Sequence, residues 1–177
     1  IIPPEELKLI DNGILKTLMS NRVPGKFIKE STGSMRLGAR QRSVVMGMAP
    51  GTLVIEAPGG SSPEEMKKDL IKAAIEEGLD YAYIVRKLNN RGDQYLYRVS
   101  VSDGTETLVN GAEITNISLQ RLKRVLSISK NQIAENIMLG GVIPMSVIYP
   151  SGLLLEDVEI NVKRKNPQKN SPLIINR

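Results

Sequence analysis

Few residues of this 177-residue chain could do chemistry, because the sequence contains no histidine and no cysteine. Ser-His-Asp triads, cysteine nucleophiles, disulfides and the common zinc sites are therefore excluded. Ser127-Ile128-Ser129-Lys130 matches the Ser-x-x-Lys pattern, in which an amine activates a serine nucleophile. The companion Ser-Asp-Asn and Lys-Thr-Gly elements are missing. We therefore interpret the stretch as a helix C-terminus, where Lys130 stabilises the negative end of the helix dipole.

Three acidic residues, Glu156, Asp157 and Glu159, lie close together near the end of the chain. Carboxylates at such spacing could perform acid–base work or hold Mg²⁺ or Ca²⁺. On an extended strand, Asp157 and Glu159 share one face and Glu156 points the other way. Because short charge clusters usually belong to solvated faces, we favour a solvent-exposed strand over a site.

Two short glycine-containing motifs complete the candidates. Ala57-Pro58-Gly59-Gly60 precedes a helix start and could hold an anion through backbone N–H groups. It lacks the Lys-Ser/Thr of a P-loop, so a plain strand-to-helix connection is favoured. Arg91-Gly92-Asp93 spells a tripeptide known from cell-adhesion ligands, but such a tripeptide recurs by chance in polar turns. The sequence thus assigns no catalytic, cofactor-binding or metal-binding residue to this chain.

The strands predicted around these motifs are joined mostly by hairpins. Asn12-Gly13 lies between two apolar runs and predicts a type I′ turn, and Asp103-Gly104 predicts a second hairpin. Residues 20–42 are rich in glycine and basic residues and are expected to form a long loop. The predicted strands outside the first hairpin are 44–48, 52–56, 81–88, 95–101, 105–109, 142–149 and 153–162.

Two amphipathic helices are predicted. The first begins at Ser62, the expected N-cap, continues with Pro63 and the capping-box residue Glu65, and ends before Gly78. The second covers residues 118–130, with an apolar face formed by Leu119, Leu122, Val125 and Leu126. The elements together predict an α+β fold with a mainly antiparallel sheet, partly closed or barrel-like. We expect a single domain over 1–165 and a polar tail over 166–177.

The net charge of +5 raises the question of an acidic partner. Loop 22–42 and the second predicted helix carry basic residues that could contact phosphates. However, no helix-turn-helix partner precedes that helix, and one Phe with no Trp gives no stacking platform, so nucleic acid is the less favoured partner. No stretch approaches the ~20 apolar residues of a membrane span, so no membrane partner is expected. The opening Ile1-Ile2-Pro3-Pro4 indicates a fragment of a longer polypeptide.

Three segments in order resemble one family. They are Asp11–Arg22 with the glycine-rich stretch to Arg42, Gly51–Glu56 followed by Ser62–Glu65, and Tyr97–Ile114 followed after a gap by Pro144–Glu159. "NGILK", "NGAEI" and "PSGLLLEDVEI" carry most of the match. Over nearly the whole chain, the sequence is similar to the C-terminal half of TldD/PmbA proteins, described as metallopeptidases or modulators of DNA gyrase.

The resemblance implies a cytoplasmic bacterial protein that is usually dimeric, with an N-terminal α/β part and a β-rich C-terminal part. Active members carry a His-Glu-x-x-x-His helix upstream of the matched region, and its two histidines bind zinc. They also place a Cys ligand in the C-terminal half, where Glu135–Gly141 of this chain has none. The chain is therefore similar to the PmbA-like members that lack this Cys. Zinc is possible in the full-length parent, and no cofactor is expected in this chain.

The resulting hypothesis is a C-terminal domain that shapes the substrate cleft and dimer interface of a metallopeptidase-related protein involved in proteolysis. The expected partners are its own N-terminal region, a homo- or hetero-oligomer and an unfolded peptide. Two alternatives stay open: a non-catalytic peptide-binding or regulatory subunit, in which a sheet edge accepts an added strand, and a basic nucleic-acid-binding module.

Overall fold

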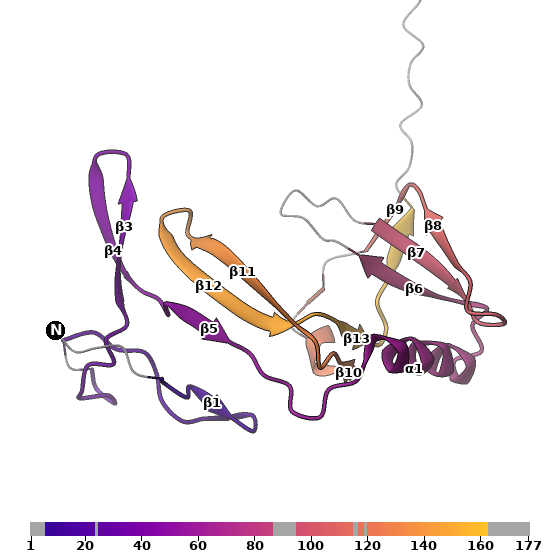
Figure 1. Ribbon diagram of the computed structural model, residues 1–177, viewed down its shortest axis with the longest axis horizontal. Coiled ribbons are helices and arrows are strands. Elements are labelled where there is room, and N and C mark those ends of the chain that lie inside the picture. Colours follow the sequence, from indigo (N-terminus) through magenta and orange to yellow (C-terminus); the bar gives the residue numbers. More distant parts are fainter. Residues whose placement is uncertain (1–5, 24, 87–94, 115–116, 119, 163–177) are drawn as a thin grey trace, which may run out of the picture. The chain divides into compact units, whose positions relative to one another are not determined.

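The computed structural model describes residues 6–23, 25–86, 95–114, 117–118 and 120–162 (Figure 1). The chain divides into two compact units, and each combines segments that are distant in the sequence. The first unit is Ile1–Pro58 with Asn131–Ser151, and the second is Gly59–Lys130 with Gly152–Arg177. Arg91-Gly92-Asp93 and the predicted tail 166–177 lie outside the described residues.

The first unit consists of two hairpins and a three-stranded sheet. The hairpins are β1 (Ile10–Asp11) with β2 (Ile14–Leu15), and β3 (Met35–Arg40) with β4 (Ser43–Met48). The sheet has the order β11-β12-β5, with β11 (Gln132–Leu139) and β12 (Ile143–Pro150) antiparallel and β5 (Thr52–Val54) parallel to β12. A short strand from early in the chain therefore completes a hairpin from late in the chain.

Turn chemistry explains the first hairpin. Asn12 and Gly13 have φ angles of 49° and 77°, the positive values that a type I′ turn requires, so the predicted turn is confirmed. The predicted long loop is wrong over residues 35–40, which form β3 and pair with β4 through all six residues. Period-two alternation of apolar and polar residues outweighs the breaks that Gly38 introduces.

Close backbone approach explains the glycines of the β3–β4 hairpin. A Cβ atom at residue 38 would collide with the carbonyl oxygen of Val142, and one at residue 47 would lie 2.8 Å from Ile143 Cδ1. Ile143 itself is buried at 7% exposure, and Ala49 beside the hairpin is fully buried. The glycine-bearing face of the hairpin thus contacts the start of β12.

The second unit is built on the antiparallel sheet β6-β7-β8, formed by β6 (Tyr81–Arg86), β7 (Tyr95–Ser100) and β8 (Glu106–Val109). Its central strand β7 supplies Leu96 and Val99, which are fully buried. Helix α1 (Pro63–Glu76) contacts β6 and buries Ala74. The remaining elements are β9 (Ala112–Ile114) paired with β14 (Ile160–Val162), the 3₁₀ turn η1 (Arg121–Lys123), and β10 (Val125–Ile128) paired with β13 (Leu153–Leu155).

The start and end of α1 confirm the prediction. Ser62 Oγ accepts a hydrogen bond from the Glu65 N–H at 3.2 Å, and the Glu65 carboxylate accepts one from the Ser62 N–H at 2.7 Å. The hydrogen bond from the Ser62 N–H, followed by one with the Ser62 side chain, holds the pKa of the Glu65 carboxyl below its ordinary value. Gly78 follows the helix with a φ of 67°, as expected for a C′ glycine.

The second predicted helix, 118–130, is wrong. Residues 121–123 form the 3₁₀ turn η1, and Val125–Ile128 extend as β10 to pair with Leu153–Leu155. β-branched Val125 and Ile128 suit a strand better than a helix, and pairing with a distant strand decides between the two. The predicted strand 153–162 is also divided, because Asp157 adopts a φ of 54° between β13 and β14.

The fold class is confirmed in its β-rich and mainly antiparallel character. Within the described ranges α1 is the one α-helix, and the strands form four two-stranded and two three-stranded sheets, none of them closed. The predicted second helix and barrel-like closure are therefore not found there. The described helix also lacks the length and apolar character needed to cross a bilayer.

Removing the N-cap of α1 should weaken the second unit. We expect Ser62→Ala to lower the free energy of unfolding by about 1 kcal/mol, because the Glu65 N–H loses its hydrogen-bond acceptor, Ser62 Oγ. Urea denaturation measures this change. Ser62→Asp, which retains an acceptor, serves as the control, and an equal loss in both variants would contradict the capping role.

Adding a methyl group at Gly38 should destabilise the first unit. We expect Gly38→Ala to lower the free energy of unfolding by about 1–3 kcal/mol, because the Val142 backbone cannot move aside as a side chain could. Gly25→Ala is the matched control, since a Cβ there meets nothing closer than the Ile28 carbonyl oxygen at 3.6 Å. Similar thermal unfolding of both variants would contradict the close approach.

Candidate functional site

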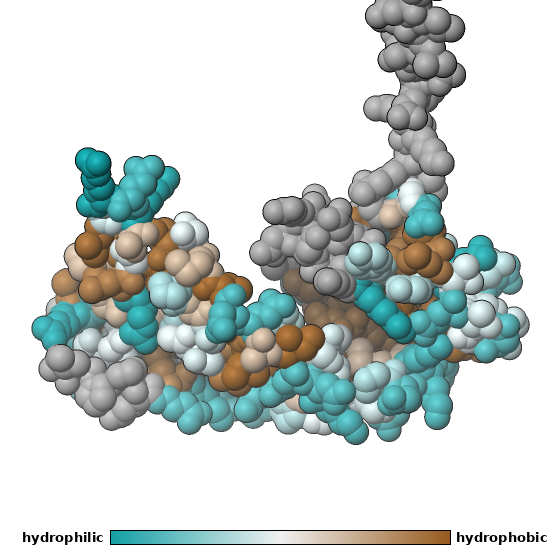
Figure 2. All heavy atoms as spheres, turned by 45° about the horizontal axis from the view of Figure 1, so that its top comes forward, coloured by the Kyte–Doolittle hydropathy of each residue, from teal (hydrophilic) through white to brown (hydrophobic). Residues whose placement is uncertain are grey.

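The β3–β4 hairpin carries an exposed apolar face, which we call the apolar ladder. Residues directly opposite each other on paired strands point to the same face, and the register joins Met35 to Met48, Leu37 to Met46 and Ala39 to Val44. The exposed fractions reach 63% at Leu37, 72% at Val44 and 68% at Met46. In Figure 2, brown apolar atoms lie beneath the teal tip of this hairpin. The hairpin therefore turns its apolar side outward and its glycine side toward β12.

Strand β11 is exposed along its whole length. It lies at the end of the sheet order, so among the described strands only β12 pairs with it. Ile133, Ile137, Met138 and Leu139 are each 38–54% exposed. On the β12 side, Tyr149 lies near Glu135, and burial together with that carboxylate raises the pKa of the Tyr149 hydroxyl. Beside β11, a shallow hollow of about 420 Å³ is lined by Gly51, Asn136, Ile137, Met138, Pro144, Met145 and Ser146.

The segment between β2 and β3 is closed at its base by hydroxyl groups. Ser20 Oγ donates to the Glu30 carbonyl oxygen at 2.6 Å, and Thr32 Oγ1 accepts from the Ser20 N–H at 2.7 Å. Ser34 Oγ lies 2.8 Å from Thr32 Oγ1. Away from this base, Phe27 is 82% exposed, with Lys26 Nζ 5.3 Å from its ring centroid. The one phenylalanine of the chain is therefore displayed, not buried.

An ionic cluster joins α1 to the sheet of the second unit. Glu106 accepts hydrogen bonds from Lys67 Nζ at 2.8 Å and from Arg86 Nη2 at 2.6 Å. The Lys67 hydrogen bond is the main cause that lowers the pKa of Glu106, and the Arg86 charge adds to it. Arg86 also lies 5.1 Å from the Tyr97 ring centroid. This arrangement fixes the helix to the strands.

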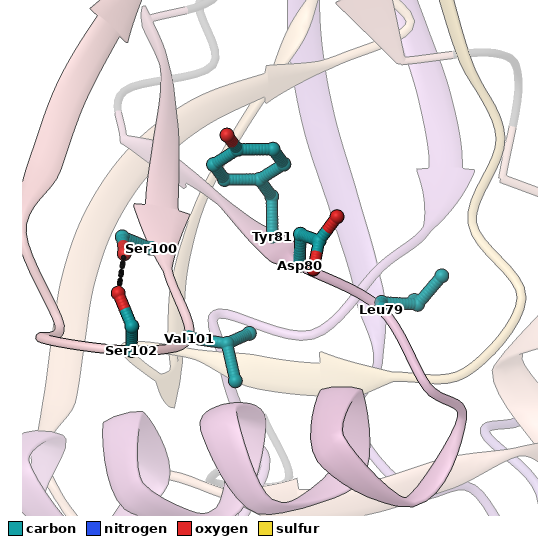
Figure 3. A pocket seen from close by; sticks show the side chains of 6 residues that line it. All are labelled: Leu79, Asp80, Tyr81, Ser100, Val101 and Ser102. Carbon is teal, nitrogen blue, oxygen red and sulfur yellow. Dashed lines mark hydrogen bonds between the residues drawn. The ribbon is translucent and has the colours of Figure 1, made fainter.

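A second hollow, of about 310 Å³, lies where α1 is followed by β6 (Figure 3). Its lining residues are Leu79, Asp80, Tyr81, Ser100, Val101 and Ser102. The hydroxyls of Ser100 and Ser102 lie 2.9 Å apart and bond to each other, while the Asp80 carboxylate is directed away from them. The Arg98 guanidinium covers the Tyr81 ring at 4.4 Å. Ser100 also hydrogen-bonds to the Asp103 carboxylate, whose pKa is lowered mainly by hydrogen bonds with Thr105 and further by this one with Ser100.

The Ser-x-x-Lys stretch has a structural role in this fold, but not as the predicted helix end. Ser127 lies in β10, whereas Lys130 follows after the strand has ended at Ile128. Ser127 Oγ donates to Ser61 Oγ at 3.2 Å, and the Lys130 N–H donates to the Ser61 carbonyl oxygen at 2.9 Å. Both residues therefore tie β10 to the segment before α1.

The other motifs also have structural positions. Gly60 lies against the backbone of Ile128 and Lys130, where a Cβ would come within 2.7 Å of the Lys130 nitrogen, which supports the plain connection over an anion site. Asp157 pairs with Arg124, and its positive φ means that Asp157 and Glu159 do not share one strand face as predicted. In the described part of the chain, no three His, Cys, Asp or Glu side chains are grouped to hold a metal ion.

This geometry defines a class of protein. It is a β-rich domain with outward apolar surfaces, and its described residues assemble no reaction centre. The family model for the PmbA/TldA metallopeptidase C-terminal domain matches residues 2–161. The chain belongs to this family, as its sequence resemblance predicted. No match was found among curated proteins or among solved structures.

Acid should remove the contribution of the ionic cluster to stability. A carboxylate whose pKa is lowered in the folded state stabilises the fold at pH values above its ordinary pKa of 4.5. This contribution is lost as the pH falls through the folded-state pKa. We expect Glu106→Gln to lower the free energy of unfolding by about 1 kcal/mol at pH 7 and to have less effect at pH 3. Urea denaturation at both pH values tests this.

The control is Glu76→Gln. The carboxylate of Glu76 lies 3.9 Å from Lys72 Nζ, and both side chains are mostly exposed, so its removal should change stability little. Equal effects of the two substitutions at pH 7 would contradict the assignment of a special role to Glu106.

Proposed function

We propose that this domain supplies the walls of a substrate cleft and the contact surface for the rest of a PmbA/TldD-type protein, while residues outside this chain carry the chemistry. The observation that carries the proposal is the apolar ladder. A two-stranded hairpin normally buries its apolar face against the core, and this one directs that face outward. Another part of the protein that covered the ladder would complete the missing layer.

The size of the ladder favours a specific contact over incidental exposure. Burying one Val, Leu or Met side chain contributes roughly 1.5–3 kcal/mol. The ladder places Met35, Leu37, Val44, Met46 and Met48 on one face. Covering them together would contribute several times the free energy of burying one side chain. A contiguous apolar patch of this kind is typical of an interaction site. Methionine suits such a surface because its flexible thioether adapts to the facing atoms. We take the covering element to be the N-terminal region of the same protein.

The side-chain inventory supports the division of labour. Zinc in peptidases is held by imidazole, thiolate and carboxylate groups, and this chain has neither of the first two. Its residues therefore do not fit a zinc centre, and no catalytic step is assigned to them. A wall contributes differently, because it positions a peptide and excludes water around chemistry performed by other residues.

Polar substitution of the ladder should weaken its contact with the N-terminal region. Leu37 and Met46 are directly opposite each other, so Leu37→Ser with Met46→Ser removes the centre of the ladder. We expect at least tenfold weaker binding between the domain and the N-terminal region, measured by calorimetry, with the unfolding free energy of the domain changed by less than about 0.5 kcal/mol. Mixed with zinc and an unfolded protein, the domain alone should release no peptide fragments.

The matched control is Ile14→Ser with Leu15→Ser on the β1–β2 hairpin. These two side chains are 61% and 59% exposed, so replacing them by serine removes a similar amount of exposed apolar surface outside the ladder. Binding lost equally in both double variants, or unchanged in the ladder variant, would contradict the proposal. Peptide cleavage by the isolated domain would contradict the division of labour.

A further inference from the structure

Methionine supplies all the sulfur of this chain, because the sequence has seven methionines and no cysteine. Three of the six residues that form the apolar ladder are methionines, namely Met35, Met46 and Met48. Their side chains are 39%, 68% and 49% exposed, whereas Met145 in β12 is only 8% exposed. The surface to which we assign a contact is therefore also a surface where oxidisable sulfur is gathered and accessible.

The register places the three thioethers together. Met35 is directly opposite Met48, so their Cβ atoms lie about 5 Å apart. Met46 precedes Met48 by two residues on the same face of β4, about 7 Å along the strand. The other three ladder positions are Leu37, Ala39 and Val44, which are apolar as well. A change of polarity at these sulfurs therefore alters one continuous apolar surface.

We propose that Met35, Met46 and Met48 form a reversible oxidation site, at which a peroxide converts the thioethers to sulfoxides and thereby blocks the contact made by the apolar ladder. The inference rests on the proposed function, because it assigns a control to the contact that the same surface makes. It goes beyond that function by naming the reactive atoms and the class of oxidant.

The oxidation needs no further group from the protein. A lone pair of the thioether sulfur attacks one oxygen of hydrogen peroxide, the O–O bond breaks, and the second oxygen leaves as water after a proton transfer through solvent. Sulfur is oxidised by two electrons and the peroxide is reduced by two. Because the step requires only access to the sulfur, we expect the most exposed ladder methionine, Met46, to react first and buried Met145 to react slowly. Thiol-dependent reductases restore the thioether, one enzyme for each sulfoxide epimer.

A sulfoxide changes what the ladder can bind. Its oxygen accepts hydrogen bonds, and burying it against an apolar surface that offers no donor is unfavourable. The flexible, apolar thioether that adapts to facing atoms is lost at the same time. The opposite side of the hairpin holds the glycine contacts with Val142 and Ile143, so oxidation on the outward face leaves these contacts in place. Loss of the contact without loss of the fold is the expected result.

Treatment of the 177-residue chain with hydrogen peroxide tests the site. We expect mass spectrometry to find Met46 oxidised at least tenfold faster than Met145. Calorimetry should then show at least tenfold weaker binding of the N-terminal region to the oxidised chain, while far-ultraviolet circular dichroism stays unchanged. Treatment of the oxidised chain with the two methionine sulfoxide reductases should restore the binding.

Matched leucine variants assign the effect to the ladder. Leucine keeps the volume and apolar character of methionine but has no sulfur to oxidise. The triple variant Met35→Leu, Met46→Leu and Met48→Leu should bind as the natural chain does and keep this binding after peroxide treatment. The control is Met138→Leu, which removes a methionine of β11 that is 54% exposed and lies outside the ladder. Its binding should stay as sensitive to peroxide as that of the natural chain.

Two results would overturn the proposal. If the oxidised natural chain binds the N-terminal region as tightly as the untreated chain, sulfoxides on the ladder do not control the contact. If peroxide weakens the triple leucine variant as much as the natural chain, other residues are responsible. In both cases the untreated chain still binds, so the proposed function stands. If the untreated chain does not bind, the proposed function fails and the oxidation site fails with it.

Discussion

Backbone pairing between strands that are far apart in the sequence is the interaction on which this structure depends. β5 extends the β11–β12 hairpin, β9 pairs with β14, and β10 pairs with β13. An isolated two-stranded hairpin is marginally stable in water, so these distant partners turn local hairpins into supported sheets. They also explain why each compact unit contains two separate stretches of the chain. The glycines at positions 38 and 60 serve the same end, because they let backbone segments approach each other closely.

This dependence also explains which parts of the fold the sequence could predict. The Asn12-Gly13 turn and the Ser62–Glu65 capping box are determined by residues three or fewer positions apart, and both are confirmed. Residues 118–130 have a helical apolar pattern, yet β10 forms there because Leu153–Leu155 offers a strand partner. That partner strand lies far along the chain from residues 118–130, so the local sequence pattern does not reveal it. β11 was not predicted for a related reason, since its apolar residues show no clear alternation.

The candidate site was only partly predictable. The motifs singled out for possible chemistry, including Ser127–Lys130 and the residues around Asp157, hold backbone segments or ion pairs. The apolar ladder was missed although its signal was present, because Met35, Leu37 and Ala39 alternate with Arg36, Gly38 and Arg40. Alternation predicts a strand with one apolar face, but it does not say whether that face is covered. Only the glycine contacts with Val142 and Ile143 show which side of the hairpin faces the core.

The composition of the core connects this architecture to function. The most buried apolar side chains of the described residues are aliphatic, small or medium in size, and few, with Leu96 and Val99 the largest that are fully enclosed. Larger apolar groups such as Phe27 and Met46 are exposed instead. Since apolar burial is the main favourable contribution to folding, such a domain gains stability when another surface covers these groups. Association and folding are then coupled in free energy, which is how the contact proposed for the apolar ladder would stabilise the domain.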